Sequence, residues 1–303
     1  MAVGLDSKAL VWTGLGVGVL ALALVVGLQF EGRKERVEQE AIRHQRADTV
    51  QRLRISLATA VQAERGAVLA ITDEASRKHA DEARAAIGLV MEETRQLREL
   101  QARGRAETEI GMFDRFAATF DAFRRVDAQV LDLAVQNSNI KAYTLAFGPA
   151  ANAVADLDRA LAHAAAEGGE AMRLADAARI ATWRLQSALA PHIAEESDPK
   201  MTAMETEMQT QDAAVQQSLD KLDILGEAAL KSDLQVARSS YARFSELRTQ
   251  IVKLSRENTN VRSLALSLNE GQAAATACRD ALIELQEAIR REASPQMPLP
   301  KAR

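Results

Sequence analysis

The sequence predicts an all-α protein, with an N-terminal transmembrane helix followed by two tandem antiparallel four-helix-bundle units. Three observations predict this fold: a composition rich in helix-forming residues, an uncharged N-terminal segment and an internal repeat. Aromatic residues make up only 4% of the 303 residues, and glycine and proline contribute only 15 and 6. Such a composition favours helices, and no alternating strand pattern occurs from Glu31 onward.

The uncharged segment 9–30, ALVWTGLGVGVLALALVVGLQF, contains 22 residues. A helix of about 20 apolar residues crosses the hydrocarbon core of a bilayer. The segment is longer than the apolar region of a signal peptide and has no clear small-residue cleavage site, so we expect an uncleaved anchor. Gly14 and Gly18 form a GxxxG pair, through which two such helices can pack closely.

The orientation of this anchor is open on the sequence alone. Lys8 precedes the segment, whereas five basic residues follow it between Arg33 and Arg46. The positive-inside rule would place the C-terminal part in the cytoplasm, but the rule is weaker for long translocated domains.

An internal repeat sets the domain organisation. Residues 120–161 align with residues 241–282 without a gap, at a constant offset of 121. Identical pairs include Phe123/Phe244, Leu133/Leu254, Asn137/Asn258, Asn139/Asn260 and Leu161/Leu282. Each copy contains about four amphipathic helical segments, which bury their apolar faces most simply as a bundle. The predicted domains are a membrane anchor (1–30), a charged helical stalk (31–48), a first copy (49–167), a second copy (170–292) and a proline-rich disordered tail (293–303).

The longest helix of each copy carries a heptad-like apolar seam. In the first copy the seam residues step by 4 and 3 from Met112 to Phe147, and the equivalent seam in the second copy covers residues 233–268. Asn137 and Asn258 interrupt these seams at equivalent positions. A buried amide without a partner costs about 1–3 kcal/mol, so we expect both asparagines to find partners.

Two interpretations of these asparagines are open. They fix the register of the helices, or they form a polar layer that binds a small ligand, with Lys141 and Arg262 one turn away to reach an anion. Asn139 lies about 200° further around a continuous helix, so we expect it to face solvent or another helix.

The sequence predicts no enzyme, cofactor or metal, and no nucleic-acid partner. The 38 basic and 42 acidic residues are interleaved, unlike the basic patches of nucleic-acid-binding proteins. No metalloprotease, phosphate-loop, nucleophile-elbow or haem-attachment motif occurs. Cys278 is the single cysteine, which excludes an intrachain disulfide, and we expect it to pack as a small apolar residue.

Two local features have a structural interpretation and an alternative functional one. His192 precedes a predicted helix break, and Glu195 and Glu196 follow it. We interpret it as a helix-end histidine near carboxylates, and the alternative is a pH- or metal-responsive site. The stripe of Met201, Met204 and Met208 indicates core packing, with a copper or oxidation-sensing site as the alternative.

Taken together, the chain resembles the four-helix-bundle sensor domain of methyl-accepting chemotaxis receptors. The resemblance rests on the membrane helix that runs into a long first helix, the segment QAERGAVLAITDEASRKHADEA (62–83) and the N[ST]N[IV][KR] pattern at 137 and 258. The chain has neither the HAMP linker nor the signalling hairpin of those receptors. The resemblance therefore implies an extracytoplasmic sensory or ligand-binding module, which forms a homodimer.

We accordingly expect a sensory module in the inner membrane, with one span and the bundles outside, that signals through a separately encoded receptor or other partner. A cytoplasmic location of the bundles is the alternative orientation. The alternative function is a membrane-tethered scaffold or spacer with no small-molecule ligand.

Overall fold

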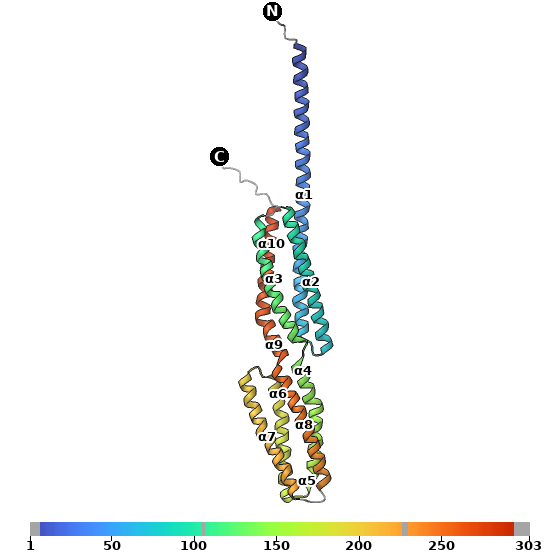
Figure 1. Ribbon diagram of the computed structural model, residues 1–303, viewed down its shortest axis with the longest axis vertical. Helices are drawn as coiled ribbons and strands as arrows, with labels where there is room; N and C mark the ends of the chain where they lie inside the picture. The colour runs from blue at the N-terminus through green and yellow to red at the C-terminus, as the bar shows by residue number, and fades with distance from the viewer. Residues whose placement is uncertain (1–6, 105–106, 226–229, 294–303) are drawn as a thin grey trace, which may run out of the picture. The chain divides into compact units, whose positions relative to one another are not determined.

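The computed structural model describes the backbone of residues 7–104, 107–225 and 230–293, and the side chains of residues 33–104, 109–225 and 230–292. Every regular element in this part of the chain is helical, which confirms the all-α class (Figure 1). Among the residues so described, no helix combines the length and the apolar character that a membrane span needs. The expected anchor 9–30, with Gly14 and Gly18, and the expected tail 293–303 lie outside the described side chains.

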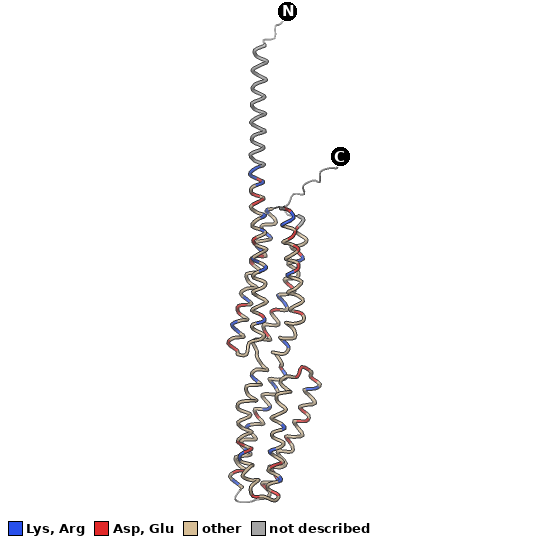
Figure 2. The backbone as a smooth tube through the Cα atoms, turned by 180° about the vertical axis from the view of Figure 1, so that it is seen from behind, with Lys and Arg blue, Asp and Glu red and all other residues tan. Residues whose placement is uncertain are grey.

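The helical elements follow one another with short connections. They are α1 (Ser7–Leu69), α2 (Asp73–Gly104), α3 (Glu107–Ala134), α4 (Ser138–Leu145), the π-helical segment η1 (Ala146–Ala150), α5 (Ala151–Ala166), α6 (Gly169–Ala194), α7 (Asp198–Leu225), α8 (Lys231–Glu257), α9 (Thr259–Leu266), the π-helical segment η3 (Ser267–Gly271) and α10 (Gln272–Ala293). Basic and acidic residues are interleaved along the described helices (Figure 2).

The first compact unit consists of Met1–Ala58, Ala86–Phe120 and Thr276–Arg303, so it combines parts of α1, α2, α3 and α10. Its core includes Leu53, Leu97, Phe116, Cys278 and Leu285. Cys278 is fully buried and free, and burial raises the pKa of its thiol to about 12, so it packs as a small apolar residue as predicted. Arg54 and Arg115 bind Gln286 and Glu284, which joins α10 to α1 and α3.

The second compact unit consists of Thr59–Ala85 and Asp121–Ala275. Its larger core is built by α5, α6, α7 and α8, with Leu161, Leu185, Leu219, Phe244 and Ile251 among its buried side chains. Helix α5 comes from the first copy, whereas α6, α7 and α8 come from the second. A smaller core joins α1, α2 and α3 around Ala67, Ala80 and Val130.

The two copies therefore do not fold as the separate tandem bundles 49–167 and 170–292. Each copy contributes its last helix to the bundle of the other: α5 packs on α6 and α8, and α10 packs on α1 and α3. The reason is the connection after α5, which consists of only two residues before α6 begins at Gly169. Gly168 (φ 79°) and Gly169 (φ 57°) adopt positive φ values that favour glycine, and this tight turn makes α5 and α6 antiparallel neighbours. The glycine pair is thus a turn inside a bundle and not a linker between bundles.

The predicted continuous seams are broken at the two asparagines. Asn137 and Asn258 both have φ of 52° and lie in the left-handed region, which asparagine tolerates better than most residues. Helix α3 ends before Asn137 and α8 ends before Asn258. The π-helical segments η1 and η3 follow at equivalent positions, 146–150 and 267–271. Pro149, which has no N–H to donate, lies in η1.

Candidate functional site

The two helix breaks contact each other reciprocally. We call the six residues at the breaks the asparagine layer: Asn137, Ser138, Asn139, Asn258, Thr259 and Asn260. The backbone N–H of Ser138 donates to Thr259 Oγ1 (3.1 Å), and the N–H of Thr259 donates to Ser138 Oγ (3.0 Å). The N–H groups of Asn139 and Asn260 each donate to the other residue's side-chain oxygen at 3.1 Å. The first N–H groups of a helix have no partner inside it, so each copy caps the new helix of the other copy.

The side-chain amides extend this contact to α2 and to the end of α6. Asn139 Nδ2 donates to Asn258 Oδ1 (2.7 Å) and to the carbonyl of Ile193 (2.8 Å). Asn258 Nδ2 donates to the carbonyl of Glu195 (2.9 Å), and Asn137 Nδ2 donates to Asp73 Oδ1 (3.0 Å). The prediction that Asn137 and Asn258 find partners is confirmed. Their amides are bonded to protein atoms, so a ligand would have to displace those bonds.

Asn139 faces the other copy and not solvent, since it is only 8% exposed. Its position could not be read from the helical period, because the left-handed residue Asn137 turns the chain two residues earlier. The asparagines of each N-x-N pattern therefore act together in one layer, although a continuous helix would separate them.

The two predicted cationic residues differ in their surroundings. Lys141 Nζ lies 3.3 Å from Asp73 Oδ2, so it meets the same carboxylate as Asn137. Burial opposes ionisation of Asp73, but the hydrogen bonds from Asn137 and Lys141 outweigh it and lower the pKa of this carboxyl. Arg262 is exposed, and its backbone N–H donates to the carbonyl of Asn258. The structure thus brings Asn137, Asn258 and Lys141 into one network, with the Arg262 side chain at the surface.

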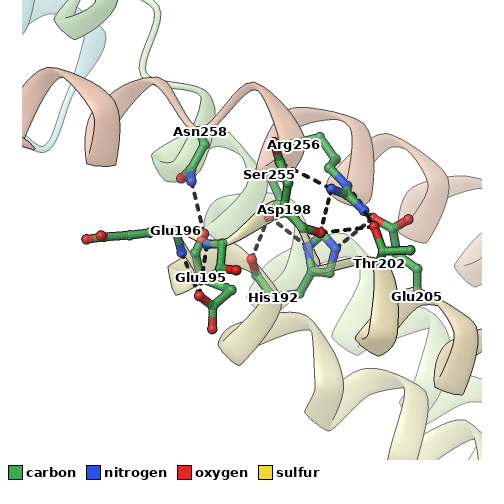
Figure 3. A network of polar contacts seen from close by, with 10 residues as sticks. His192, Glu195, Glu196, Asp198, Thr202, Glu205, Ser255, Arg256 and Asn258 are labelled. Atoms are coloured by element: carbon green, nitrogen blue, oxygen red, sulfur yellow. Dashed lines mark hydrogen bonds and ion pairs between the residues drawn. The ribbon is translucent and has the colours of Figure 1, made fainter. Parts of the chain in front are cut away.

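A second polar network lies beside the layer, around His192 in the last turn of α6 (Figure 3). His192 is 1% exposed, with Nδ1 at 2.8 Å from Ser255 Oγ and Nε2 at 2.9 Å from Glu205 Oε1. Arg256 Nε also donates to Glu205 Oε1, at 2.7 Å. We call His192, Glu205, Ser255 and Arg256 the His192 network. Three helices, α6, α7 and α8, supply its members.

The carboxylate that meets His192 differs from the expectation. Glu195 and Glu196 are neighbours in sequence, but the contact is made by Glu205, which α7 brings across. Glu195 instead accepts hydrogen bonds from the N–H groups of Ser197 and Glu196 (2.9 and 3.1 Å). The hydrogen bond from Arg256 lowers the pKa of Glu205, so this group accepts and His192 Nε2 donates.

The hydroxyl of Ser255 has one hydrogen and two acceptors within reach. It lies 2.8 Å from the carbonyl oxygen of His192 and 2.8 Å from His192 Nδ1. When it donates to the carbonyl, Nδ1 must carry a hydrogen; when it donates to Nδ1, the carbonyl loses that bond. The protonation of the ring and the capping of α6 are therefore linked through one hydroxyl group.

Ser255, His192 and Glu205 form a serine–histidine–acid line, but they are not a hydrolytic site. Ser255 is fully buried, so no substrate carbonyl reaches its oxygen, as nucleophilic catalysis requires. The described residues contain no group of three or more His, Cys, Asp and Glu side chains that could hold a metal ion. Of the predicted methionine stripe, Met201 and Met208 are buried in the core and Met204 is half-buried. The arrangement fits a structural or switching role.

Comparison of the chain with protein-family models finds no match, and comparisons with curated proteins and with solved structures find none either. Any functional proposal for this protein therefore rests on the geometry of its own residues.

The equivalent positions in the first copy are apolar. Helix α2 begins at Asp73 and α7 begins 125 residues later, at Asp198. At this offset His192 and Glu205 correspond to Ala67 and Ala80, and at the offset of 121 Ser255 and Arg256 correspond to Ala134 and Val135. Sequence reasoning missed Glu205, Ser255 and Arg256. The signal that could have found them is this exchange of apolar for polar residues between the copies.

Proposed function

We propose that this protein is a membrane-anchored sensory module, similar in role to the sensor domains of chemotaxis receptors, which passes a signal to a separately encoded partner. The observation that carries the proposal is the reciprocal asparagine layer. Each helix break is capped by side chains of the other copy, so a change at one break alters the caps of the other. Hydrogen-bond networks of this kind are one physical means by which a change at one site is coupled to another.

The relay begins at the His192 network and ends at α2. Ser255 and Asn258 lie three residues apart on the two sides of the α8 end. Ser255 bonds the carbonyl of His192 in the last turn of α6, and Asn258 bonds the carbonyl of Glu195 directly after α6. Asn258 bonds Asn139, and Asn137 bonds Asp73 in the first turn of α2. In this proposal a stimulus that moves α6 against α8 changes the helix breaks at Asn137 and Asn258. The change then reaches α2 through the hydrogen bond of Asn137 to Asp73, and α1 through the short turn between α1 and α2.

The anchor and the homodimer belong to the same proposal. Segment 9–30 spans the inner membrane once, Gly14 and Gly18 pack two copies of it together, and the bundles lie outside. An alkaline phosphatase reporter fused after Arg303 in the full-length protein tests the orientation. We expect activity; an inactive phosphatase, together with a fluorescent cytoplasmic reporter at the same position, would remove the extracytoplasmic arrangement.

Cross-linking in whole cells tests the sensory function. We expect the full-length protein to capture one specific partner, in an amount that changes with the stimulus. Replacing segment 9–30 by a Leu-Ala sequence of equal length tests whether the partner is reached through the anchor. Absence of a specific partner in every condition would contradict the proposal.

A second candidate function is a membrane-tethered scaffold or spacer. The observation that favours it is the saturation of the layer, since the amides of Asn137 and Asn258 are bonded to protein atoms. A scaffold predicts no ligand-dependent shift in thermal stability across a library of small anions, amino acids and organic acids. A sensory module with a ligand of its own predicts at least one saturable shift.

A further inference from the structure

The heavy atoms of the His192 network allow two placements of the hydrogen atoms on the ring (Figure 3). The hydrogen bond from Arg256 lowers the pKa of Glu205, so this carboxylate is ionised and accepts a hydrogen bond from His192 Nε2. Nε2 therefore carries a hydrogen in both placements. In the neutral ring Nδ1 is then an acceptor, whereas in a ring with a second proton Nδ1 is a donor.

The hydroxyl group of Ser255 has a different acceptor in each placement. Beside the neutral ring it donates to His192 Nδ1, and the carbonyl of His192 keeps a 3.4 Å contact with the backbone N–H of Glu195. Beside the doubly protonated ring, Nδ1 donates to Ser255 Oγ, and the hydroxyl hydrogen bonds the carbonyl of His192 at 2.8 Å. The second proton therefore adds one hydrogen bond between α6 and α8.

The charged groups around the ring are balanced when it holds the second proton. Glu205 and Asp198 of α7 both bind the guanidinium of Arg256 on α8, at 2.7 and 3.2 Å. Glu195, directly after α6, pairs with Lys200 of α7 at 3.6 Å, and α4 reaches this end of α6 through a neutral asparagine amide. Two carboxylates thus face one guanidinium. A neighbouring carboxylate favours the charged form of a histidine, against the cost of burial.

The fold does not require a titratable group at this place. The first copy has Ala67 and Ala134 at the positions of His192 and Ser255, and neither of them titrates. Histidine is the side chain whose charge ordinarily changes between pH 5 and pH 8. The second copy therefore has a proton-sensitive group at a helix end that the first copy builds from small apolar side chains.

We propose that His192 is a proton-operated switch: a second proton on the ring turns the Ser255 hydroxyl from Nδ1 to the carbonyl of His192 and holds the end of α6 against α8. Asn258, three residues after Ser255, bonds the carbonyl of Glu195, so the same end is tied to the asparagine layer. Acid strengthens this junction, and rising pH loosens it. The role of the switch as a stimulus rests on the proposed function, since the relay begins here, but the switch itself needs no partner protein.

Nitrogen NMR of the imidazole rings in the full-length protein, from pH 5 to pH 9, tests the two placements directly. His192 should show a hydrogen on Nε2 throughout and a second one on Nδ1 at the acid end alone. Replacing His44, His79 and His163 by glutamine identifies the His192 signal without touching its network. His163, an exposed ring near Asp233, is the control in the wild type. A His192 ring with one protonation state over the whole range, or a neutral ring with its hydrogen on Nδ1, would overturn the proposal.

Amide hydrogen exchange at residues 193–195 gives a second readout. After correction for the intrinsic effect of pH, exchange should be about two- to tenfold slower with the doubly protonated ring, because one more hydrogen bond must open. Ser255→Ala should abolish this difference. Ser239→Ala is the matched control, because Ser239 is exposed on the same helix and bonds the carbonyl of Val236. An equal pH effect in Ser255→Ala and the wild type would overturn the switch.

The two proposals fail separately. A His192 switch that works in a protein without any specific partner would support this inference and remove the sensory function. A specific partner captured by a protein whose His192 ring never changes its protonation would support the sensory function and overturn the switch.

Discussion

The ends of α1 and α6 occupy equivalent places in the two copies, but they are held by different chemistry. In the second copy the His192 network surrounds the end of α6. In the first copy the equivalent residues are Ala67, Ala80, Ala134 and Val135, which pack in a small apolar core. There the hydroxyl of Ser76 lies within reach of the carbonyls of Ala67 (3.2 Å) and Ala134 (3.1 Å). In the first copy, one hydroxyl group and a few small side chains are therefore enough to hold the ends of α1 and α3 together.

The comparison teaches that the buried polar groups are additions to the fold. The His192 network occurs only in the second copy. The buried carboxyl groups of Glu64 and Asp127 occur only in the first, and the second copy has Leu189 and Arg248 at the equivalent positions. Buried polar groups cost free energy unless every member is paired. The members of the His192 network are paired, whereas Glu64 Oε1 and Asp127 Oδ1 in the first copy have no hydrogen-bond partner. The asparagine layer is different, because both copies contribute equal atoms to it. The equal part couples the two copies to each other, and the unequal parts distinguish one copy from the other.

The largest effect on stability is expected from substitutions in the asparagine layer, to which both copies contribute equally. Asn137→Leu and Asn258→Leu should each lower the free energy of unfolding by about 3–4 kcal/mol, because leucine is strained at positive φ and two hydrogen-bond partners lose their bonds. Asn137→Gly and Asn258→Gly keep the backbone and should lose only about 1–2 kcal/mol. Chemical denaturation measures all four variants. Stabilisation by leucine at either position would mean that the breaks are not needed, and a large difference between the positions would contradict their equivalence.

The next largest effect on stability is expected in the His192 network, which only the second copy contains. Glu205→Ala should cost about 2–3 kcal/mol, because it leaves the buried His192 Nε2 without its acceptor and removes the acceptor of Arg256 Nε, although Arg256 keeps its bonds to Asp198 and Thr202. Replacing His192, Glu205, Ser255 and Arg256 together by the first copy's Ala, Ala, Ala and Val should cost about 1–3 kcal/mol less than the sum of the four single changes. Thermal and urea unfolding of the set measure this. Strict additivity would show that the four residues do not form one network.

A smaller effect should result from giving the second copy a carboxylate of the kind found in the first. Gln186 Nε2 donates to the carbonyl of Ala146 in η1 at 2.8 Å, and Ala146 is the equivalent of Ser267. Gln186→Glu should cost about 1–2 kcal/mol at pH 8, where the carboxylate cannot donate. The loss should shrink as pH falls, since a protonated carboxyl donates again. Gln217→Glu, at an exposed position of α7, is the control and should change little at either pH.

The smallest effect is expected at the two cationic residues. Lys141→Ala should cost less than about 0.5 kcal/mol, because its pair with Asp73 is partly exposed, and Arg262→Ala should cost still less. Denaturation at low and high salt measures both. A normal stability combined with a lost response to an anionic ligand would instead place Lys141 and Arg262 in a ligand site.

The sequence was sufficient for the helical class and for much of the core. Phe123 and Phe244, matched by the repeat, are both fully buried. The break at Asn137 was not predictable from periodicity, because a heptad pattern assumes a continuous helix and a single positive φ leaves no trace in it. The exchange of α5 and α10 was missed because a glycine pair marks a tight turn and a linker equally well. The contact of His192 with Glu205 depends on how α7 packs against α6, and the spacing of residues in the sequence does not reveal how two helices pack.

The reciprocal caps have a consequence for the origin of the chain. Ser138 contacts Thr259 as Thr259 contacts Ser138, and Asn139 and Asn260 do the same. This is the rule of an isologous, two-fold symmetric interface, in which one surface recognises its own copy. A single-copy ancestor could have made these contacts between two molecules that exchanged their last helices. Fusion of the two genes would then have freed each half to acquire residues that a symmetric pair must carry twice.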